Sequence, residues 1–224
     1  MNPEFDERAL LALFHDPDSD REAFRAPFLA GGYVCATDNH SLILIRPEAC
    51  RGTYRPQNLD VLRFLKPGKD APATMTLADL RQAIAKVPGR QETRIVSPAV
   101  LCPECGGQGQ VEWTRQTGEA RIYRHYFECP ACRGTGNSRE AIKKPTGRRI
   151  PAPFEIIGIR RQVFNARMLL VLCDAMELLG IDKAAYTAGA DRCSAIFTLT
   201  DQVTIILAPC VPAEKPAVSL PEKP

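Results

Sequence analysis

Two copies of one eight-residue pattern constrain this chain more than any other feature. Segments 102–109 and 129–136 both read C-x-x-C-x-G-x-G. A C-x-x-C turn lets two sulfur atoms reach one ion, and a tetrahedral zinc centre needs two such turns. The paired glycines can adopt positive φ at little steric cost, so the backbone can curl around the sulfurs and aim N–H groups at them. The pattern therefore predicts one zinc ion per chain. The predicted ligands are Cys102, Cys105, Cys129 and Cys132.

The zinc ion is expected to have a structural role and not a catalytic one. Four protein ligands complete the tetrahedron and leave no position for water or substrate, so His125, between the two turns, is predicted to be a surface residue. Zinc binding contributes on the order of 10–16 kcal/mol in small zinc peptides, enough to fold an insert that has no core.

Length and composition indicate a globular protein. The chain has 224 residues and is 45% hydrophobic. Its apolar runs, such as 168–173 and 203–207, are far shorter than the ~20 residues that span a bilayer. The acidic start lacks the features of a signal peptide, and five further cysteines without paired spacing fit reduced thiols, so we predict a cytoplasmic protein with no membrane partner. These cysteines are Cys35, Cys50, Cys173, Cys193 and Cys210.

Basic charge is concentrated around the zinc pattern. Segment 102–149 contains nine Lys and Arg against five Glu, a formal charge of +4, whereas the rest of the chain totals −1. Clustered positive charge favours nucleic acid or another acidic partner, and it also suits a well-solvated insertion.

The segment between the two zinc turns reads as a β-hairpin. Strands are predicted at 110–115 and 120–128, joined by 116–119. Aromatic and arginine side chains share this ribbon, which could stack bases or bind phosphates, although aromatics on a hairpin also pack against one another. The residues predicted to contact nucleic acid or another partner are Trp113, Arg115, Arg121, Tyr123, Arg124, Lys143, Lys144, Arg148 and Arg149.

The flanking sequence predicts an α+β fold with antiparallel strands. Before the insert, the pattern indicates a helix at 5–14, apolar strands at 28–37 and 40–45 around an Asp-Asn turn, and a helix capped by Thr76. After it come a strand at 154–159, a helix capped by Asn165, and strands at 184–187, 193–200 and 203–207.

The repeated cysteine pattern resembles the zinc module of DnaJ-type chaperones. That module carries four such motifs and two zinc ions, whereas this chain has half of it, within 102–136. The J-domain signature His-Pro-Asp is replaced by His15-Asp16-Pro17. The resemblance therefore implies the four metal ligands and not co-chaperone activity.

A second resemblance is to bacterial DNA polymerase sliding clamps. Segment 33–42, YVCATDNHSL, looks like the clamp hairpin "ATDGHRL", and 164–170, FNARMLL, is similar to the start of the last clamp repeat. The matches cover 28–46 and 154–210. They imply clamp-like antiparallel sheets with helices, plus an inserted zinc-stabilised β-hairpin. A clamp subunit has three such domains and closes a ring of six as a dimer, whereas this chain has material for about one, so ring and monomer both stay open.

The predicted organisation has four parts. Residues 1–100 and 151–210 form the two parts of the clamp-like domain, 101–150 form the zinc-binding insertion with a basic linker, and 211–224 form a flexible proline-rich tail.

The predicted function is that of a noncatalytic DNA-associated accessory or scaffold protein. The chain has no nucleophile elbow, P-loop or dinucleotide fingerprint, and its three histidines form no motif, so we predict no enzymatic activity. The expected partners are DNA and a protein. The alternatives are a chaperone-like, protein-binding zinc module and a thiol-redox protein that uses its C-x-x-C pairs.

Overall fold

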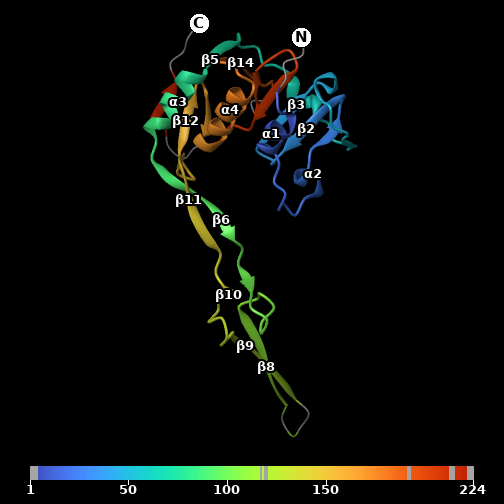
Figure 1. Ribbon diagram of the computed structural model, residues 1–224, viewed down its shortest axis with the longest axis vertical. Coiled ribbons are helices and arrows are strands. Elements are labelled where there is room, and N and C mark those ends of the chain that lie inside the picture. The colour runs from blue at the N-terminus through green and yellow to red at the C-terminus, as the bar shows by residue number, and fades with distance from the viewer. Residues whose placement is uncertain (1–4, 117, 119–120, 191–192, 212–214, 221–224) are drawn as a thin grey trace. The chain divides into compact units, whose positions relative to one another are not determined.

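The computed structural model describes residues 5–116, 118, 121–190, 193–211 and 215–220. Residue contacts divide the chain into two units (Figure 1). Unit 1 combines Met1–Arg90 with Ile150–Pro224, and unit 2 is Gln91–Arg149. Among the described residues, no helix has the length and apolarity needed to cross a membrane.

Unit 1 is built on an eight-stranded sheet. The first two strands at one edge pair in parallel, and the other neighbouring strands pair antiparallel. The strands, in order across the sheet, are β4 (Arg55–Pro56), β1 (Phe28–Ala30), β2 (Tyr33–Thr37), β3 (Ser41–Ile45), β16 (Val203–Leu207), β15 (Ala195–Thr198), β14 (Lys183–Ala188) and β5 (Ala73–Thr76). The central pair, β3 and β16, joins segments from the two sides of the insertion. The predicted α+β class is confirmed.

Two helices of unit 1 begin at the side-chain caps that the sequence predicts. The Thr76 hydroxyl accepts a hydrogen bond from Asp79 N at 3.1 Å, and Asn165 Oδ1 accepts one from Arg167 N at 2.9 Å. The helices are α1 (Glu7–Ala12), α2 (Glu22–Arg25), α3 (Leu77–Lys86) and α4 (Ala166–Leu178), with 3₁₀ turns η1 (Pro47–Ala49) and η2 (Leu62–Leu65).

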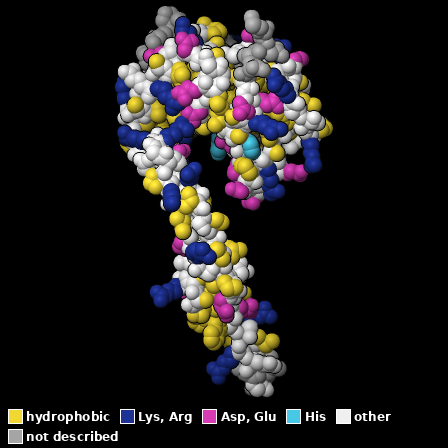
Figure 2. Space-filling model, in the orientation of Figure 1, with side chains coloured by type: hydrophobic (Ala, Val, Ile, Leu, Met, Phe, Trp, Pro, Cys, Tyr) yellow, Lys and Arg dark blue, Asp and Glu magenta, His cyan; other side chains and the backbone are white. Residues whose placement is uncertain are grey.

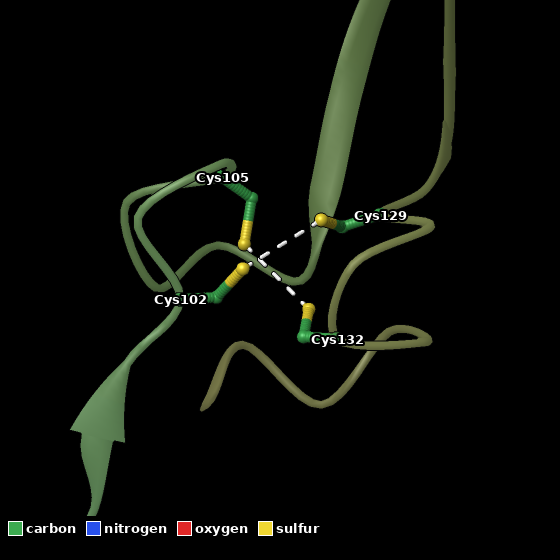
Figure 3. Close-up of side chains that lie close together, drawn as sticks. All are labelled: Cys102, Cys105, Cys129 and Cys132. Carbon is green, nitrogen blue, oxygen red and sulfur yellow. Dashed lines mark hydrogen bonds between the residues drawn. The ribbon is translucent and has the colours of Figure 1, made fainter. Parts of the chain in front are cut away.

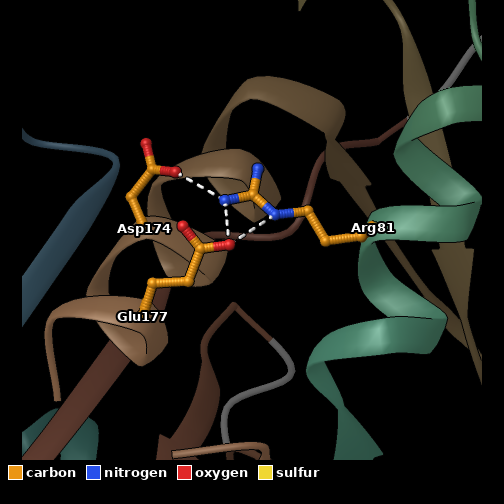
Figure 4. Close-up of polar contacts among 3 residues, drawn as sticks. All are labelled: Arg81, Asp174 and Glu177. Carbon is orange, nitrogen blue, oxygen red and sulfur yellow. Dashed lines mark hydrogen bonds and ion pairs between the residues drawn. The ribbon is translucent and has the colours of Figure 1, made fainter. Parts of the chain in front are cut away.

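Helices α3 and α4 are joined by an ion-pair group. The Arg81 guanidinium donates to the Asp174 carboxylate at 3.0 Å and to Glu177 at 2.6 Å (Figure 4). All three side chains retain some exposure, so solvent screens the attraction between their charges. The ion pairs therefore contribute little to the stability of unit 1, and their main effect is on the relative orientation of the two helices.

The core lies on both faces of the sheet because side chains alternate along each strand. In β3, Ile43 and Ile45 join the main core with the helices, whereas Leu42 and Leu44 join a smaller cluster with Val61. All five residues of β3 are buried as a result.

The apolar run predicted as one strand at 28–37 is two strands. Gly31 and Gly32, with φ of +57° and +80°, form a two-residue turn between Ala30 and Tyr33, which are paired in the ladder. Glycine adopts such positive φ readily, so the hairpin closes where the apolar pattern alone showed no break.

A smaller sheet alters the expectation for the tail. Strands β13 (Gln162–Asn165) and β17 (Val218–Leu220) flank β12 (Ile156–Ile159), with β17 parallel to β12. The prediction of a flexible tail at 211–224 is therefore wrong at 218–220, which form a strand. Apolar side chains alternate there, and Leu220 is buried in the main core. Residues 212–214 and 221–224 lie outside the described residues.

Unit 2 is a series of nested strand pairs closed by one hairpin (Figure 1). The segment predicted as a basic linker, at the end of 101–150, is a strand instead, because it pairs with a segment far away in sequence. The pairs are β6 (Gly89–Ser97) with β11 (Ile142–Pro151), β7 (Val100–Leu101) with β10 (Asn137–Arg139), and β8 (Gln110–Gln116) with β9 (Ile122–Glu128).

Candidate zinc centre and hairpin surface

The four predicted zinc ligands converge on one point, with their sulfur atoms directed toward one another (Figure 3). The Sγ atoms of Cys102 and Cys129 are 3.8 Å apart, those of Cys105 and Cys132 are 3.7 Å apart, and all four lie within 4.8 Å of one another. Sulfurs placed about 2.3 Å from a central ion at tetrahedral angles are about 3.8 Å apart. The cluster is therefore compatible with one zinc ion.

The two cysteine turns hold each other through a symmetric set of backbone contacts. Gly109 N donates to the Cys105 sulfur and Gly136 N donates to the Cys132 sulfur, each at 3.3 Å. Across the two turns, Cys102 N donates to Gly136 O and Cys129 N donates to Gly109 O, each at 2.8 Å. Hydrogen bonds to sulfur stabilise thiolate, which is the form that binds a metal.

The thiol pKa values differ within the cluster. Burial opposes ionisation of Cys105, but the N–H groups of Gly109 and Gly107 outweigh it and lower the pKa of this thiol to about 7. Burial raises the pKa of the Cys129 thiol to about 11. A zinc ion at this cluster would have to displace a proton from Cys129, so its binding should weaken as the pH falls.

Two glycines in the motif are required by steric contact as well as by backbone angle. Gly109 (φ +74°) and Gly136 (φ +78°) lie so close to the opposite turn that a Cβ would come within 2.4 Å of a backbone oxygen, that of Gly134 or of Gly107 respectively. No real Cβ tolerates this distance, so the two turns would have to separate.

We therefore predict that Gly109→Ala weakens zinc binding at least about tenfold, since the left-handed backbone alone costs about 1–2 kcal/mol. Competition with a chromophoric chelator measures the affinity. The control is Gly118→Ala, where a Cβ would meet no atom of the described residues within 4 Å. Equal zinc affinity for the two variants would contradict the steric account.

The hairpin β8–β9 separates its side chains into two chemically different faces. Directly opposed residues of an antiparallel pair share a face. The face that we call the aromatic face carries the opposed pairs Val111↔Phe127, Trp113↔His125 and Arg115↔Tyr123. The opposite face carries Gln110↔Glu128, Glu112↔Tyr126, Thr114↔Arg124 and Gln116↔Ile122.

Most of the aromatic face is open to solvent. Trp113 is 64% exposed, Tyr123 57% and Phe127 51%. Val111, at the base of this face, packs against the cysteine cluster. In the space-filling view, hydrophobic and basic side chains lie interspersed on the surface of unit 2 (Figure 2).

The predicted contact residues are distributed over four places. Trp113, Arg115 and Tyr123 lie together on the aromatic face, whereas Arg124 lies on the opposite face, 3.3 Å from the Glu112 carboxylate. Arg121 precedes β9 and is exposed. The remaining four lie exposed along β11, and they are Lys143, Lys144, Arg148 and Arg149.

Two members of the aromatic face, His125 and Phe127, were missing from the predicted contact set. The rings of His125 and Phe127 have centroids 4.6 Å apart, and Trp113 meets Phe127 edge-to-face at 6.4 Å. Period-2 alternation along both strands was the signal that could have grouped them, but it needed the register across the hairpin.

A cavity of about 340 Å³ lies in unit 1, on the smaller core cluster. Its walls combine apolar side chains, among them Phe64 and Ile206, with the turn between β2 and β3. In that turn, Asp38 Oδ1 accepts hydrogen bonds from the backbone N–H groups of His40 and Ser41, at 2.9 and 2.7 Å. The cavity was not predicted from the sequence, since its walls come from distant segments.

Comparison with solved structures finds bacterial sliding clamps, the class that the sequence resemblance named. The DNA polymerase III subunit beta from Pseudomonas aeruginosa is 13% identical, with 90% of this chain and 62% of that chain covered and a TM-score of 0.41. The C. crescentus beta sliding clamp is 15% identical, with 92% and 65% covered and a TM-score of 0.43. The Helicobacter pylori beta clamp is 9% identical, with 91% and 62% covered and a TM-score of 0.43.

The chain thus spans 62–65% of the length of these clamp structures. No protein-family model matches the chain, and no curated protein matches its sequence.

Proposed function

We propose that this chain is a noncatalytic, DNA-associated accessory or scaffold protein whose insertion is held by one structural zinc ion. The observation that carries the proposal is the charge of the pair β6–β11. Within 91–97 and 142–149, one acidic residue, Glu92, accompanies five exposed basic residues. A linear polyanion is the partner that such a run of positive charge fits. The basic residues are Arg94, Lys143, Lys144, Arg148 and Arg149.

The proposed zinc site supports this role by keeping the strands in register. Between the pairs β7–β10 and β8–β9 the chain forms the two cysteine turns, and isolated two-stranded ribbons are marginal in water. Zinc held by all four thiols would supply the missing cross-link there. With four protein ligands it would have no open position for a substrate.

The test of this proposal is salt-dependent DNA binding. Replacing Lys143, Lys144, Arg148 and Arg149 with Ala should weaken binding to all sequences alike. The slope of log affinity against log salt should fall by about 0.9 for each phosphate that the variant no longer neutralises.

A charge-matched control removes four exposed basic residues from unit 1 instead, and it should bind DNA as the unmodified chain does. DNA binding that is absent at low salt, or equal in the two quadruple variants, would contradict the proposal. The control residues are Arg55, Lys69, Lys86 and Lys183.

A second candidate function, binding of a peptide from a partner protein, is favoured by the cavity in unit 1. A concave site with apolar walls and a few polar groups suits one buried apolar side chain of a ligand. Methyl NMR would test it: short peptides with a single leucine or phenylalanine should shift the signals of Leu59, Val61 and Ile206. Shifts spread over the whole core would contradict a site at the cavity.

A further inference from the structure

We propose that the aromatic face of the hairpin β8–β9 binds single-stranded nucleic acid by stacking unpaired bases. This inference rests on the proposed function and names the form of nucleic acid and the surface that receives it. Three observations support it, namely the register of the hairpin, its charge distribution and the exposure of its rings.

The register gathers the aromatic side chains on one face. Trp113 lies directly opposite His125. Phe127 and Tyr123 are each two positions from His125 along β9, so their side chains lie on the same face as those of His125 and Trp113. The hairpin therefore presents four rings on one face, from Phe127 beside Val111 to Tyr123 farther along the hairpin. Tyr126 is the one aromatic residue of the two strands on the opposite face.

The charges of the two strands separate in the same way. The aromatic face carries Arg115 and no carboxylate, whereas the opposite face carries Glu112 and Glu128. There, Glu112 also partly neutralises Arg124 at 3.3 Å. A polyanionic strand is thus attracted to the aromatic face and repelled by the carboxylates behind it.

Three of the rings contact one another through Phe127, and the rings of this face remain accessible. Contacts of Phe127 with Trp113 and His125 restrict their motion, yet Trp113, Tyr123 and Phe127 each keep half or more of their surface exposed. Exposed aromatic rows of this kind mark interaction surfaces. Bases of a duplex already stack on one another, whereas unpaired bases offer free faces to aromatic rings, which favours a single strand.

The experiment uses the full zinc-loaded chain, in which Trp113 is the sole tryptophan, so its fluorescence reports on this face alone. Titration with a 12-nucleotide oligo(dT) should quench this fluorescence, and a 12-base-pair duplex should quench it much less. Trp113→Ala and Tyr123→Ala should each weaken oligo(dT) binding roughly 5- to 150-fold, measured by anisotropy of a labelled strand.

The matched control is Tyr126→Ala. Tyr126 has the same side chain and nearly the same exposure as Tyr123, 60% against 57%, but lies on the opposite face. Its replacement should change oligo(dT) affinity less than about twofold, because no base stacks there. Zinc content is measured for every variant, so that weaker oligo(dT) binding can be distinguished from unfolding of the insertion.

The outcomes separate this inference from the proposed function. Salt-dependent binding of DNA without quenching, or with Tyr123→Ala equal to Tyr126→Ala, overturns the stacking face and leaves the proposed function standing. Absence of binding to both single strands and duplex at 50 mM salt overturns both. Quenching by an unfolded apolar peptide and not by oligo(dT) also overturns the inference, and supports the chaperone-like alternative.

Discussion

A Cys102→Ser chain is expected to lose zinc and the ordered structure of the two cysteine turns, while unit 1 stays folded. Cys102 supplies one of four clustered sulfurs, and serine cannot replace a thiolate as a zinc ligand. The loss should exceed about 100-fold in zinc affinity, because residues that merely orient metal ligands already account for about 10- to 100-fold. Unit 1 should survive since it has its own buried core.

Elemental analysis and hydrogen exchange measure this result together. The unmodified chain should contain one zinc ion, and amides near the cysteine turns should exchange rapidly only in the Cys102→Ser variant. Cys193→Ser is the control, because Cys193 is an exposed cysteine outside the cluster. Two zinc ions per chain, none in the unmodified protein, or full zinc retention in Cys102→Ser would each contradict the assignment.

Phe197→Ala should reduce the free energy of unfolding of unit 1 by about 3–5 kcal/mol and leave the zinc content unchanged. The Phe197 ring is fully buried, with centroids 5.2 Å from the Tyr186 ring and 6.1 Å from the Phe164 ring. Its removal would leave a cavity at the centre of the main core. Denaturant unfolding followed by near-UV circular dichroism of the tyrosines measures the change.

The control for the core is Leu178→Ala on α4, where the leucine is 40% exposed and its loss should cost well under half as much. If Phe197→Ala lowered the free energy of unfolding by less than about 1 kcal/mol, the claim that this ring packs at the centre of the main core would be contradicted. Release of zinc by the same substitution would contradict the independence of the two units.

The structural elements that could be predicted from the sequence are those specified by residues close together in the chain. The helix caps at Thr76 and Asn165 and the strand at 203–207 agree with the structure, because a cap or an alternating apolar strand is specified within a few residues. The C-x-x-C turns likewise place two sulfurs side by side by local geometry alone.

Strand pairs between distant segments could not be predicted in this way. β6 and β11 carry mostly polar, exposed side chains, so neither has an apolar pattern that identifies it as a strand, and each becomes one only beside the other. The strand β17 lies in the segment predicted as a flexible tail. Its apolar side chains alternate, but the strand has only three residues, too few to identify it, and its partner β12 lies about sixty residues earlier.

The candidate zinc ligands, the α+β class and the excess of positive charge around the insertion could all be read from the sequence, because each follows from residue types at short spacing. The tertiary contacts were needed to show that the four sulfurs meet, that His125 and Phe127 share a face with Trp113, and that distant segments enclose the cavity in unit 1. Each of these depends on how segments far apart in the sequence lie beside one another. In a hairpin, for example, a shift of one residue between the two strands moves every side chain to the other face, and no short segment specifies that register.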